Sequence, residues 1–188
     1  MNPLKNLRLF KSLQYTPYNT LDIAAIWYYF LQMKTIIVFA TKYGAAKEVA
    51  KLIAENIEGS AMHDLSDKNV PSINDYECVI LGSSIYAGRI RGEAKAFLEK
   101  NSKILPEKTL GFFISGLDLT REKEFFEANI PSDLLQKAKA ASTLGGIFDP
   151  KKANFFERFI IKMITKTSAV TNTINEGKIK QFAEKMKS

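Results

Sequence analysis

Short apolar runs alternate with amphipathic stretches along the chain from residue 35 onward. The apolar runs are rich in β-branched and aromatic residues and predict five strands, at 35–40, 60–65, 78–83, 110–115 and 142–148. The stretches between and after them predict helices at 48–57, 92–101, 121–141 and 178–187. Nearly continuous apolar strands that alternate with helices are typical of a parallel sheet covered on both faces. We therefore predict an α/β three-layer sandwich whose five parallel strands take the doubly wound order 2-1-3-4-5.

Small and hydroxyl residues follow three of the predicted strands. In an open α/β sheet, ligands bind beyond the carboxyl ends of the strands, near the point where the strand order reverses. The first loop runs directly into a helix, so its backbone amides and the helix dipole suit an anion. Its residues are Thr41, Lys42, Tyr43, Gly44, Ala45 and Ala46. The second loop holds Ser83, Ser84, Ile85, Tyr86, Ala87 and Gly88, and the third holds Ser115, Gly116, Leu117 and Asp118.

Each loop taken alone also fits an ordinary turn, but the three together favour a flavin. The glycines allow a flat ligand to approach the backbone, and Tyr86 is placed to stack on an aromatic ring. The first loop has neither the Walker A pattern nor the G-x-G-x-x-G fingerprint, which disfavours a nucleoside triphosphate or a dinucleotide. A monophosphate remains compatible with it.

The sequence resembles the flavodoxin superfamily across residues 33–188, and within it the flavodoxin-like, menaquinone-dependent protoporphyrinogen oxidases. The resemblance rests on KTIIVFATKYGAAKEVA (34–50), VILGSSIYAGRIRGEAKAFLEK (79–100) and, more specifically, FFERFIIKMITKTSAVTNT (155–173). It implies a flavodoxin-like fold with a helical insertion after the last strand, and FMN as the cofactor. It also implies that residues 41–46 hold the FMN phosphate, while 83–88 and 115–118 flank the isoalloxazine ring.

One position of the first loop departs from the family pattern. The family's phosphate loop usually ends in a hydroxyl residue, where this chain has Ala46. Loss of one hydrogen bond to a charged group costs on the order of 1.5–3 kcal/mol. The departure therefore predicts weakened rather than abolished FMN binding.

Charge is distributed unevenly along the chain, whose net charge is +7. Residues 1–32 contain three basic residues and one acidic residue. Residues 33–150 contain 15 basic and 16 acidic residues, and residues 151–188 contain nine basic and three acidic residues. We interpret residues 1–32 as an N-terminal extension to the domain at 33–188. This extension either lies upstream of a true start at Met33 or serves as a peripheral membrane anchor. Its apolar run at 21–31 is too short to cross a bilayer.

The basic C-terminal part contains an amphipathic segment at 151–166. A cationic stripe of Arg158, Lys162 and Lys166 runs beside an apolar face. One interpretation is that the apolar face packs on the domain. The other is that it meets a membrane surface that holds a quinone, and in that case the basic stripe contacts lipid or the carboxylates of a porphyrin. We expect a cytoplasmic protein, peripheral on the membrane in the second case, and no nucleic-acid partner.

Catalysis by protein side chains is not indicated. The chain has one cysteine, Cys78, and one histidine, His63, which disfavours a disulfide framework, a zinc cage and a serine protease-type triad. Cys78 is expected to be a buried apolar residue. We name no catalytic residue and no metal site, and expect FMN to supply the electron chemistry. The resemblance implies one of two functions: a porphyrinogen oxidase linked to a quinone or redox partner, or a flavodoxin-type electron carrier without a substrate.

Overall fold

The computed structural model describes residues 33–151 and 170–188. All the elements below belong to the compact unit Met33–Ser188. The predicted N-terminal extension, residues 1–32, and the basic stripe of Arg158, Lys162 and Lys166 lie outside the described residues.

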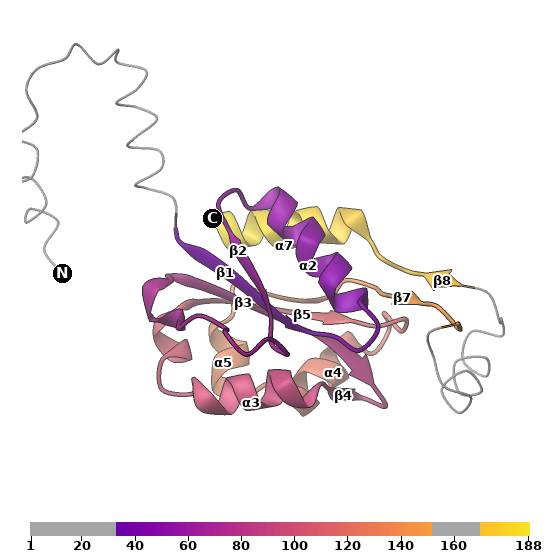
Figure 1. Ribbon diagram of the computed structural model, residues 1–188, viewed down its shortest axis with the longest axis horizontal. Helices are drawn as coiled ribbons and strands as arrows, with labels where there is room; N and C mark the ends of the chain where they lie inside the picture. The colour runs from indigo at the N-terminus through magenta and orange to yellow at the C-terminus, as the bar shows by residue number, and fades with distance from the viewer. Residues whose placement is uncertain (1–32, 152–169) are drawn as a thin grey trace, which may run out of the picture. The chain divides into compact units, whose positions relative to one another are not determined.

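The main sheet consists of five parallel strands in the order β2-β1-β3-β5-β6 (Figure 1). These strands are β1 (Thr35–Ala40), β2 (Ala61–Asp64), β3 (Cys78–Tyr86), β5 (Thr109–Ser115) and β6 (Ala140–Thr143). Numbered along the chain, this is the predicted order 2-1-3-4-5, which is confirmed. A short additional strand, β4 (Arg89–Ile90), pairs antiparallel with the end of β3.

Helices cover both faces of the sheet, as predicted, and give three layers. One face carries α2 (Ala45–Asn56) and α7 (Glu176–Lys187), and the opposite face carries α3 (Gly92–Lys100), α4 (Glu122–Asn129) and α5 (Ser132–Lys137) (Figure 1). Two 3₁₀ turns, η2 (Ile73–Asp75) and η3 (Leu105–Glu107), connect the elements.

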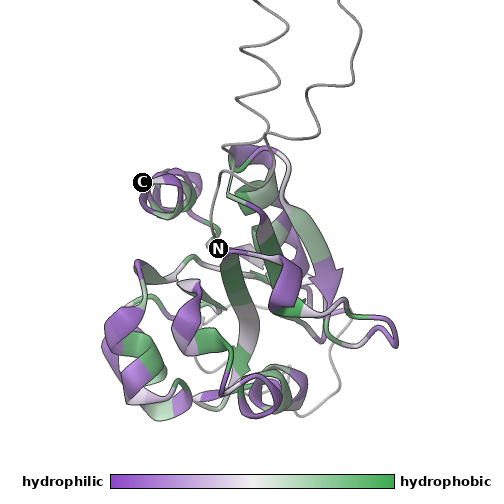
Figure 2. Ribbon diagram, turned by 90° about the vertical axis from the view of Figure 1, so that its left-hand side faces the viewer, coloured by the Kyte–Doolittle hydropathy of each residue, from purple (hydrophilic) through white to green (hydrophobic). Residues whose placement is uncertain are grey.

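The central strand β1 shows how the sequence builds two cores. Successive side chains of a strand point to opposite faces of the sheet. Accordingly, Ile37 and Phe39 pack in the cluster formed with α2 and α7, whereas Ile36 and Val38 pack in the cluster formed with α3, α4 and α5. Figure 2 shows the hydrophobic residues gathered in the strands and on the inward sides of the helices. The nearly continuous apolar pattern of the central strands follows from this burial on both faces.

The helix predicted at 121–141 is wrong as a single element. α4 ends at Asn129, Ile130 is extended with φ −109° and ψ 132°, and α5 begins after Pro131. Proline disfavours a helical conformation in the residue before it, so the helix breaks there. The end of the predicted helix, from Ala140, is instead part of the strand β6.

The strand predicted at 142–148 is also wrong as a single element. β6 ends at Thr143, and Gly145 takes a φ of +87°, which interrupts the extended backbone. The next strand, β7 (Ile147–Phe148), pairs antiparallel with β8 (Thr171–Asn172) in a separate ribbon. This ribbon brings the two ends of the predicted insertion close together, with Phe148 opposite Thr171.

Candidate functional site

The three predicted loops meet at one edge of the sheet. Ala40, the last residue before the first loop, is the register partner of Ser83 on β3. Ser84, the next residue of β3, is in turn the partner of Ser115 on β5. Because the strands are parallel and adjacent, the pairing places the starts of all three loops side by side.

The first loop turns directly into helix α2. The Gly44 amide donates a hydrogen bond of 3.0 Å to Thr41 Oγ1, and Glu48 N donates the first helical bond to Gly44 O. Gly44 has a φ of +93°, and no atom lies within 4 Å of the position that a Cβ would take there. The first amides of an α-helix have no partner within the helix and carry the positive end of its dipole. The loop therefore presents an open, electropositive turn suited to a phosphate.

Ala46 and Lys42 have different environments in this loop. Ala46 is fully buried in the core cluster between the sheet, α2 and α7. Lys42 is exposed, and its Nζ lies 5.0 Å from the centroid of the Tyr43 ring, a cation–π distance. The Ala46 methyl group therefore belongs to the core packing, whereas the Lys42 side chain lies at the surface of the loop.

The second loop is mostly strand and hairpin rather than loop, which corrects the sequence interpretation. β3 continues to Tyr86 and reverses into β4 through Ala87 and Gly88, both with positive φ values of 50° and 76°. Two positive φ values are required by the two-residue turn that matches the natural twist of a hairpin. Tyr86, at the end of β3, remains 46% exposed, so its side chain is accessible to a ligand.

Asn129, which the sequence analysis missed, fastens this hairpin to α4. Its Oδ1 accepts a 3.1 Å hydrogen bond from Ile90 N, and its Nδ2 donates to Gly88 O at 2.8 Å and to Phe125 O at 2.7 Å. On the other side of the hairpin, Ser83 Oγ accepts a 3.0 Å bond from the amide of Arg91. The hairpin that carries Tyr86 is therefore held from both sides. An asparagine at a helix end gives no sequence signal that would reveal contacts about 40 residues away.

The third loop leaves a buried hydroxyl at the site. Ser115 is only 2% exposed, and its Oγ has no hydrogen-bond partner within the described parts of the chain. Asp118 accepts hydrogen bonds from the amide and the hydroxyl of Thr120, at 2.8 and 2.7 Å. These bonds, the hydroxyl foremost, hold the pKa of the Asp118 carboxyl below its usual value. Asp118 is therefore ionised at neutral pH.

A second set of contacts that the sequence analysis missed closes this side of the site. Gly116 N donates to Gly145 O at 3.2 Å, and Thr173 bonds to Gly146 through both its amide, at 2.9 Å, and its side chain. The Gly145–Gly146 pair inside the predicted strand 142–148 was a turn signal that the prediction overlooked. The base of the β7–β8 ribbon thus lies against the third loop.

The arrangement fits FMN by three observations. The turn at Gly44 is open and precedes a helix, which suits the phosphate. Tyr86 offers a partly open aromatic ring, and the unpartnered hydroxyl of Ser115 offers a buried polar atom. Buried polar groups without partners are rare in native proteins and point to an absent ligand or water.

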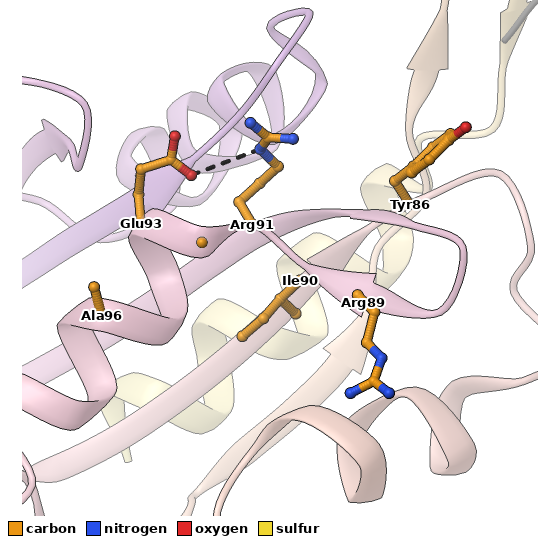
Figure 3. Close-up of a pocket in the computed structure, with 7 residues that line it drawn as sticks. Tyr86, Arg89, Ile90, Arg91, Glu93 and Ala96 are labelled. Carbon is orange, nitrogen blue, oxygen red and sulfur yellow. Dashed lines mark ion pairs between the residues drawn. The ribbon is translucent and has the colours of Figure 1, made fainter. Parts of the chain in front are cut away.

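A hollow of about 560 Å³ adjoins the hairpin (Figure 3). Its lining includes Tyr86, Arg89, Ile90, Arg91, Glu93 and Ala96. Arg91 Nε lies 3.7 Å from Glu93 Oε2. The hollow shares Tyr86 with the second loop, so it borders the candidate flavin site.

Other candidate chemistry is limited in the described residues. Cys78 is buried as predicted, and burial raises the pKa of its thiol to about 11, so it stays protonated at neutral pH. Across 33–151 and 170–188, no group of three or more acidic, cysteine or histidine side chains could hold a metal ion. None of the helices in those ranges has the length and apolar character needed to cross a bilayer.

The comparisons with known proteins agree with this geometry. The sequence model of the family described as "Flavodoxin domain" matches residues 36–173. The protoporphyrinogen IX dehydrogenase [quinone] of Escherichia coli K12 is 22% identical over 146 residues, covering 72% of this chain and 81% of that protein.

Two solved structures share the fold. One is a short-chain flavodoxin associated with a bacterial microcompartment, with a TM-score of 0.53 and 16% identity over 82% of this chain and 97% of that one. The other is flavodoxin 1 of Bacillus cereus, with a TM-score of 0.52 and 17% identity over 81% of this chain and 96% of that one.

Proposed function

Because the chain belongs to the flavodoxin domain family, we propose that it is an FMN-dependent oxidoreductase that passes electrons from a porphyrinogen-like donor to a quinone. The observation that carries the FMN part is the meeting of the open turn at Gly44, the exposed Tyr86 and the unpartnered Ser115 hydroxyl at one sheet edge. The donor and the acceptor are suggested by the similarity to the protoporphyrinogen IX dehydrogenase, which is named as quinone-linked.

Each loop has a separate role in this proposal. The amides of residues 41–46 bind the phosphate, and Thr41 holds the turn in shape through its bond to Gly44 N. Residues 83–88 and 115–118 flank the ring, with Tyr86 as the stacking side chain. FMN supplies the electron transfer when it is bound, and the protein orients it and tunes its potential. The ionised Asp118 contributes a negative charge to the third loop, and an anionic group nearby disfavours added negative charge.

Reconstitution tests the FMN part directly. The purified full chain is incubated with FMN or with riboflavin, which lacks the phosphate, and is then desalted. We expect a retained flavin spectrum with FMN and much weaker retention of riboflavin, because only FMN can use the helix α2 turn. Complete loss of FMN on desalting would overturn the proposal. Equal retention of both flavins would overturn the assignment of the phosphate to residues 41–46.

Anaerobic turnover tests the donor and the acceptor. The FMN-loaded protein is mixed with protoporphyrinogen IX and a menaquinone analogue, and porphyrin formation is followed by fluorescence. We expect turnover that requires both FMN and the quinone. A flavin that can be reduced chemically but gives no turnover would select the electron-carrier function instead.

The membrane part of the proposal concerns Arg158, Lys162 and Lys166. We propose that they bring the chain to an anionic membrane surface where the quinone is held. Co-sedimentation with anionic liposomes compares the full chain with a triple variant in which all three become Gln. We expect the wild type to pellet at low salt and the variant to stay largely in the supernatant. Failure of the wild type to pellet would overturn this part.

A further inference from the structure

The hollow beside the β3–β4 hairpin is an open depression whose lining suits a small anionic molecule. Its volume is about 560 Å³. Ile90 and Ala96 give it apolar lining, Tyr86 gives it an aromatic side chain, and Arg89 and Arg91 give it two guanidinium groups. An apolar lining with a few charged groups suits a molecule with an apolar body and acidic substituents.

The charges of the hollow are incompletely balanced. Arg91 Nε pairs with Glu93 at 3.7 Å but makes no hydrogen bond to any described residue. Arg89 is exposed, and none of the acidic groups in the described ranges lies within ion-pair distance of it. Arg89, Arg91 and Glu93 together carry a net charge of +1, so the hollow attracts anionic groups. Arginine suits carboxylates in particular, because its planar fork can donate two parallel hydrogen bonds.

In a second hollow on the surface, the charge of the arginine is fully paired with a carboxylate. This hollow lies along α4 and includes Arg121 and Glu124. There, Arg121 donates from both Nε and Nη2 to the two carboxylate oxygens of Glu124, so its charge and its donors are already used. In the hollow at the hairpin, Arg91 lies near Glu93 without a hydrogen bond from its Nε, and Arg89 has no acidic partner among the described residues, so donors of both arginines are left for an external partner.

The backbone fixes where the two arginine side chains start. Tyr86 is the register partner of Arg89, Asn129 holds the amide of Ile90 and Ser83 holds the amide of Arg91. Figure 3 shows the guanidinium groups of Arg89 and Arg91 pointing away from each other, on opposite sides of β4. Two guanidinium groups placed in this way can each bind a separate carboxylate.

We propose that this hollow is a dicarboxylate subsite, in which Arg89 and Arg91 bind two carboxylates of the electron-donating substrate while its apolar body lies along Ile90 and Ala96. Tyr86 belongs both to the hollow and to the loop assigned to the flavin ring. A molecule anchored here therefore lies next to the flavin site. The assignment of the bound molecule as the electron donor rests on the proposed function, whereas the binding of a dicarboxylate with an apolar body does not. The arginines are positioning residues rather than catalytic ones.

Protoporphyrin IX, the oxidised and air-stable product, is the probe, and its dimethyl ester is the neutral control. Binding to the full chain is followed by porphyrin fluorescence, with and without FMN. We expect wild type to bind the acid at least about tenfold more tightly than the ester, because the ester cannot accept charge-assisted hydrogen bonds from the arginines. The double variant Arg89→Gln, Arg91→Gln should lose this preference while it binds the ester unchanged. Added salt should reduce the preference in wild type.

Lys103→Gln is the matched control, because it removes an exposed positive charge outside the hollow. It should keep the wild-type preference for the acid. Retention of FMN by the double variant, read from the flavin spectrum of the same samples, shows that the variant is folded at the site. The subsite is overturned if wild type binds acid and ester equally, or if the double variant keeps the preference.

The same experiment distinguishes failure of the proposed function from failure of the subsite. If the chain does not retain FMN but its preference for the acid still depends on the two arginines, the proposed function fails and the subsite stands. In that case urea unfolding, in place of the flavin spectrum, compares the folding of the variants.

Discussion

The two sides of the candidate site are stabilised in different ways. The proposed phosphate side, at residues 41–46, is held by a hydrogen bond between residues three apart, Thr41 and Gly44, and by the start of its own helix. The proposed ring side, at residues 83–88 and 115–118, is held by bonds between residues far apart in sequence: Asn129 Nδ2 donates to Gly88 O, and Gly146 N donates to Thr173 Oγ1. One side is therefore a local structure, and the other exists only when distant elements have packed.

This difference has a consequence for stability and for binding. A local turn can be altered with little effect on the rest of the fold, because few other parts depend on it. A turn fastened to distant segments transmits any change to the elements that meet there. Substitutions on the ring side should accordingly affect folding more than equivalent substitutions on the phosphate side.

The largest expected difference in the free energy of unfolding is between the variants Gly145→Ala and Gly44→Ala. Both glycines have a φ near +90°, but a Cβ at Gly145 would lie 2.0 Å from Thr173 O, whereas a Cβ at Gly44 would meet nothing within 4 Å. We expect Gly145→Ala to lower the free energy of unfolding by about 2–5 kcal/mol, through backbone strain and steric overlap. Gly44→Ala should lower it by about 1 kcal/mol, through strain alone. Urea denaturation without FMN measures both, and equal losses would contradict the contrast.

Asn129→Ala and Asn101→Ala give the next contrast. Both asparagines lie at the end of a helix and donate from Nδ2 to the carbonyl four residues earlier, but only Asn129 also bonds to the hairpin. Asn129→Ala should cost about 1–3 kcal/mol and Asn101→Ala less than about 1 kcal/mol. Only the first should weaken FMN binding, because it releases the hairpin that carries Tyr86.

Fluorescence titration with FMN, alongside denaturation, checks this pair. Asn129→Asp keeps the acceptor for Ile90 N but places a carboxylate oxygen against Gly88 O and Phe125 O. Because the carboxylate repels both carbonyl oxygens, this variant should lose at least as much stability as the alanine variant. If Asn129→Ala leaves FMN affinity unchanged, the hairpin does not contribute to the ring side.

Ala46→Ser tests the phosphate side, with Ala50→Ser as the control. Both alanines are fully buried in α2, but only Ala46 lies at the phosphate turn. Each substitution buries a hydroxyl and should lower the stability of the FMN-free protein by about 1 kcal/mol. Only Ala46→Ser should tighten FMN binding, by about tenfold, because its hydroxyl can donate to the charged phosphate. Equal FMN affinities of the two variants would show that this position does not contact the phosphate.

The smallest effect is expected at Asp118. Hydrogen bonds from Thr120 hold the pKa of Asp118 below its usual value, so the carboxylate stabilises the fold at neutral pH and this contribution is lost as the pH falls through the lowered pKa. Thr120→Val removes the hydroxyl donor and should move the pKa back toward its usual value. Because Asp118 is exposed to solvent, the stability change should be too small for denaturation to resolve. A carboxyl NMR titration of both proteins measures the pKa, and an unchanged value would contradict the role of the hydroxyl.

The predicted elements show which features of the fold the local hydrophobic pattern can predict. The strands at 35–40 and 110–115 were predicted well because continuous apolar runs report burial on both faces directly. The helix at 121–141 and the strand at 142–148 were wrong, because their apolar residues gave the right composition but not the breaks at Pro131 and Gly145. A break depends on backbone dihedral angles, which hydrophobic periodicity does not report.

The sequence by itself determined the order of the sheet, its two cores and the three strand ends at which a ligand can bind, because alternating burial and the right-handed βαβ connection leave few other topologies. The tertiary structure alone decided how the ring side is closed. Asn129 reaches Gly88 and Thr173 reaches Gly146 only after α4 and the β7–β8 ribbon have packed. A hydrogen bond between residues tens of positions apart leaves no periodic pattern in the chain, so its geometry is set by the fold and not by the local sequence.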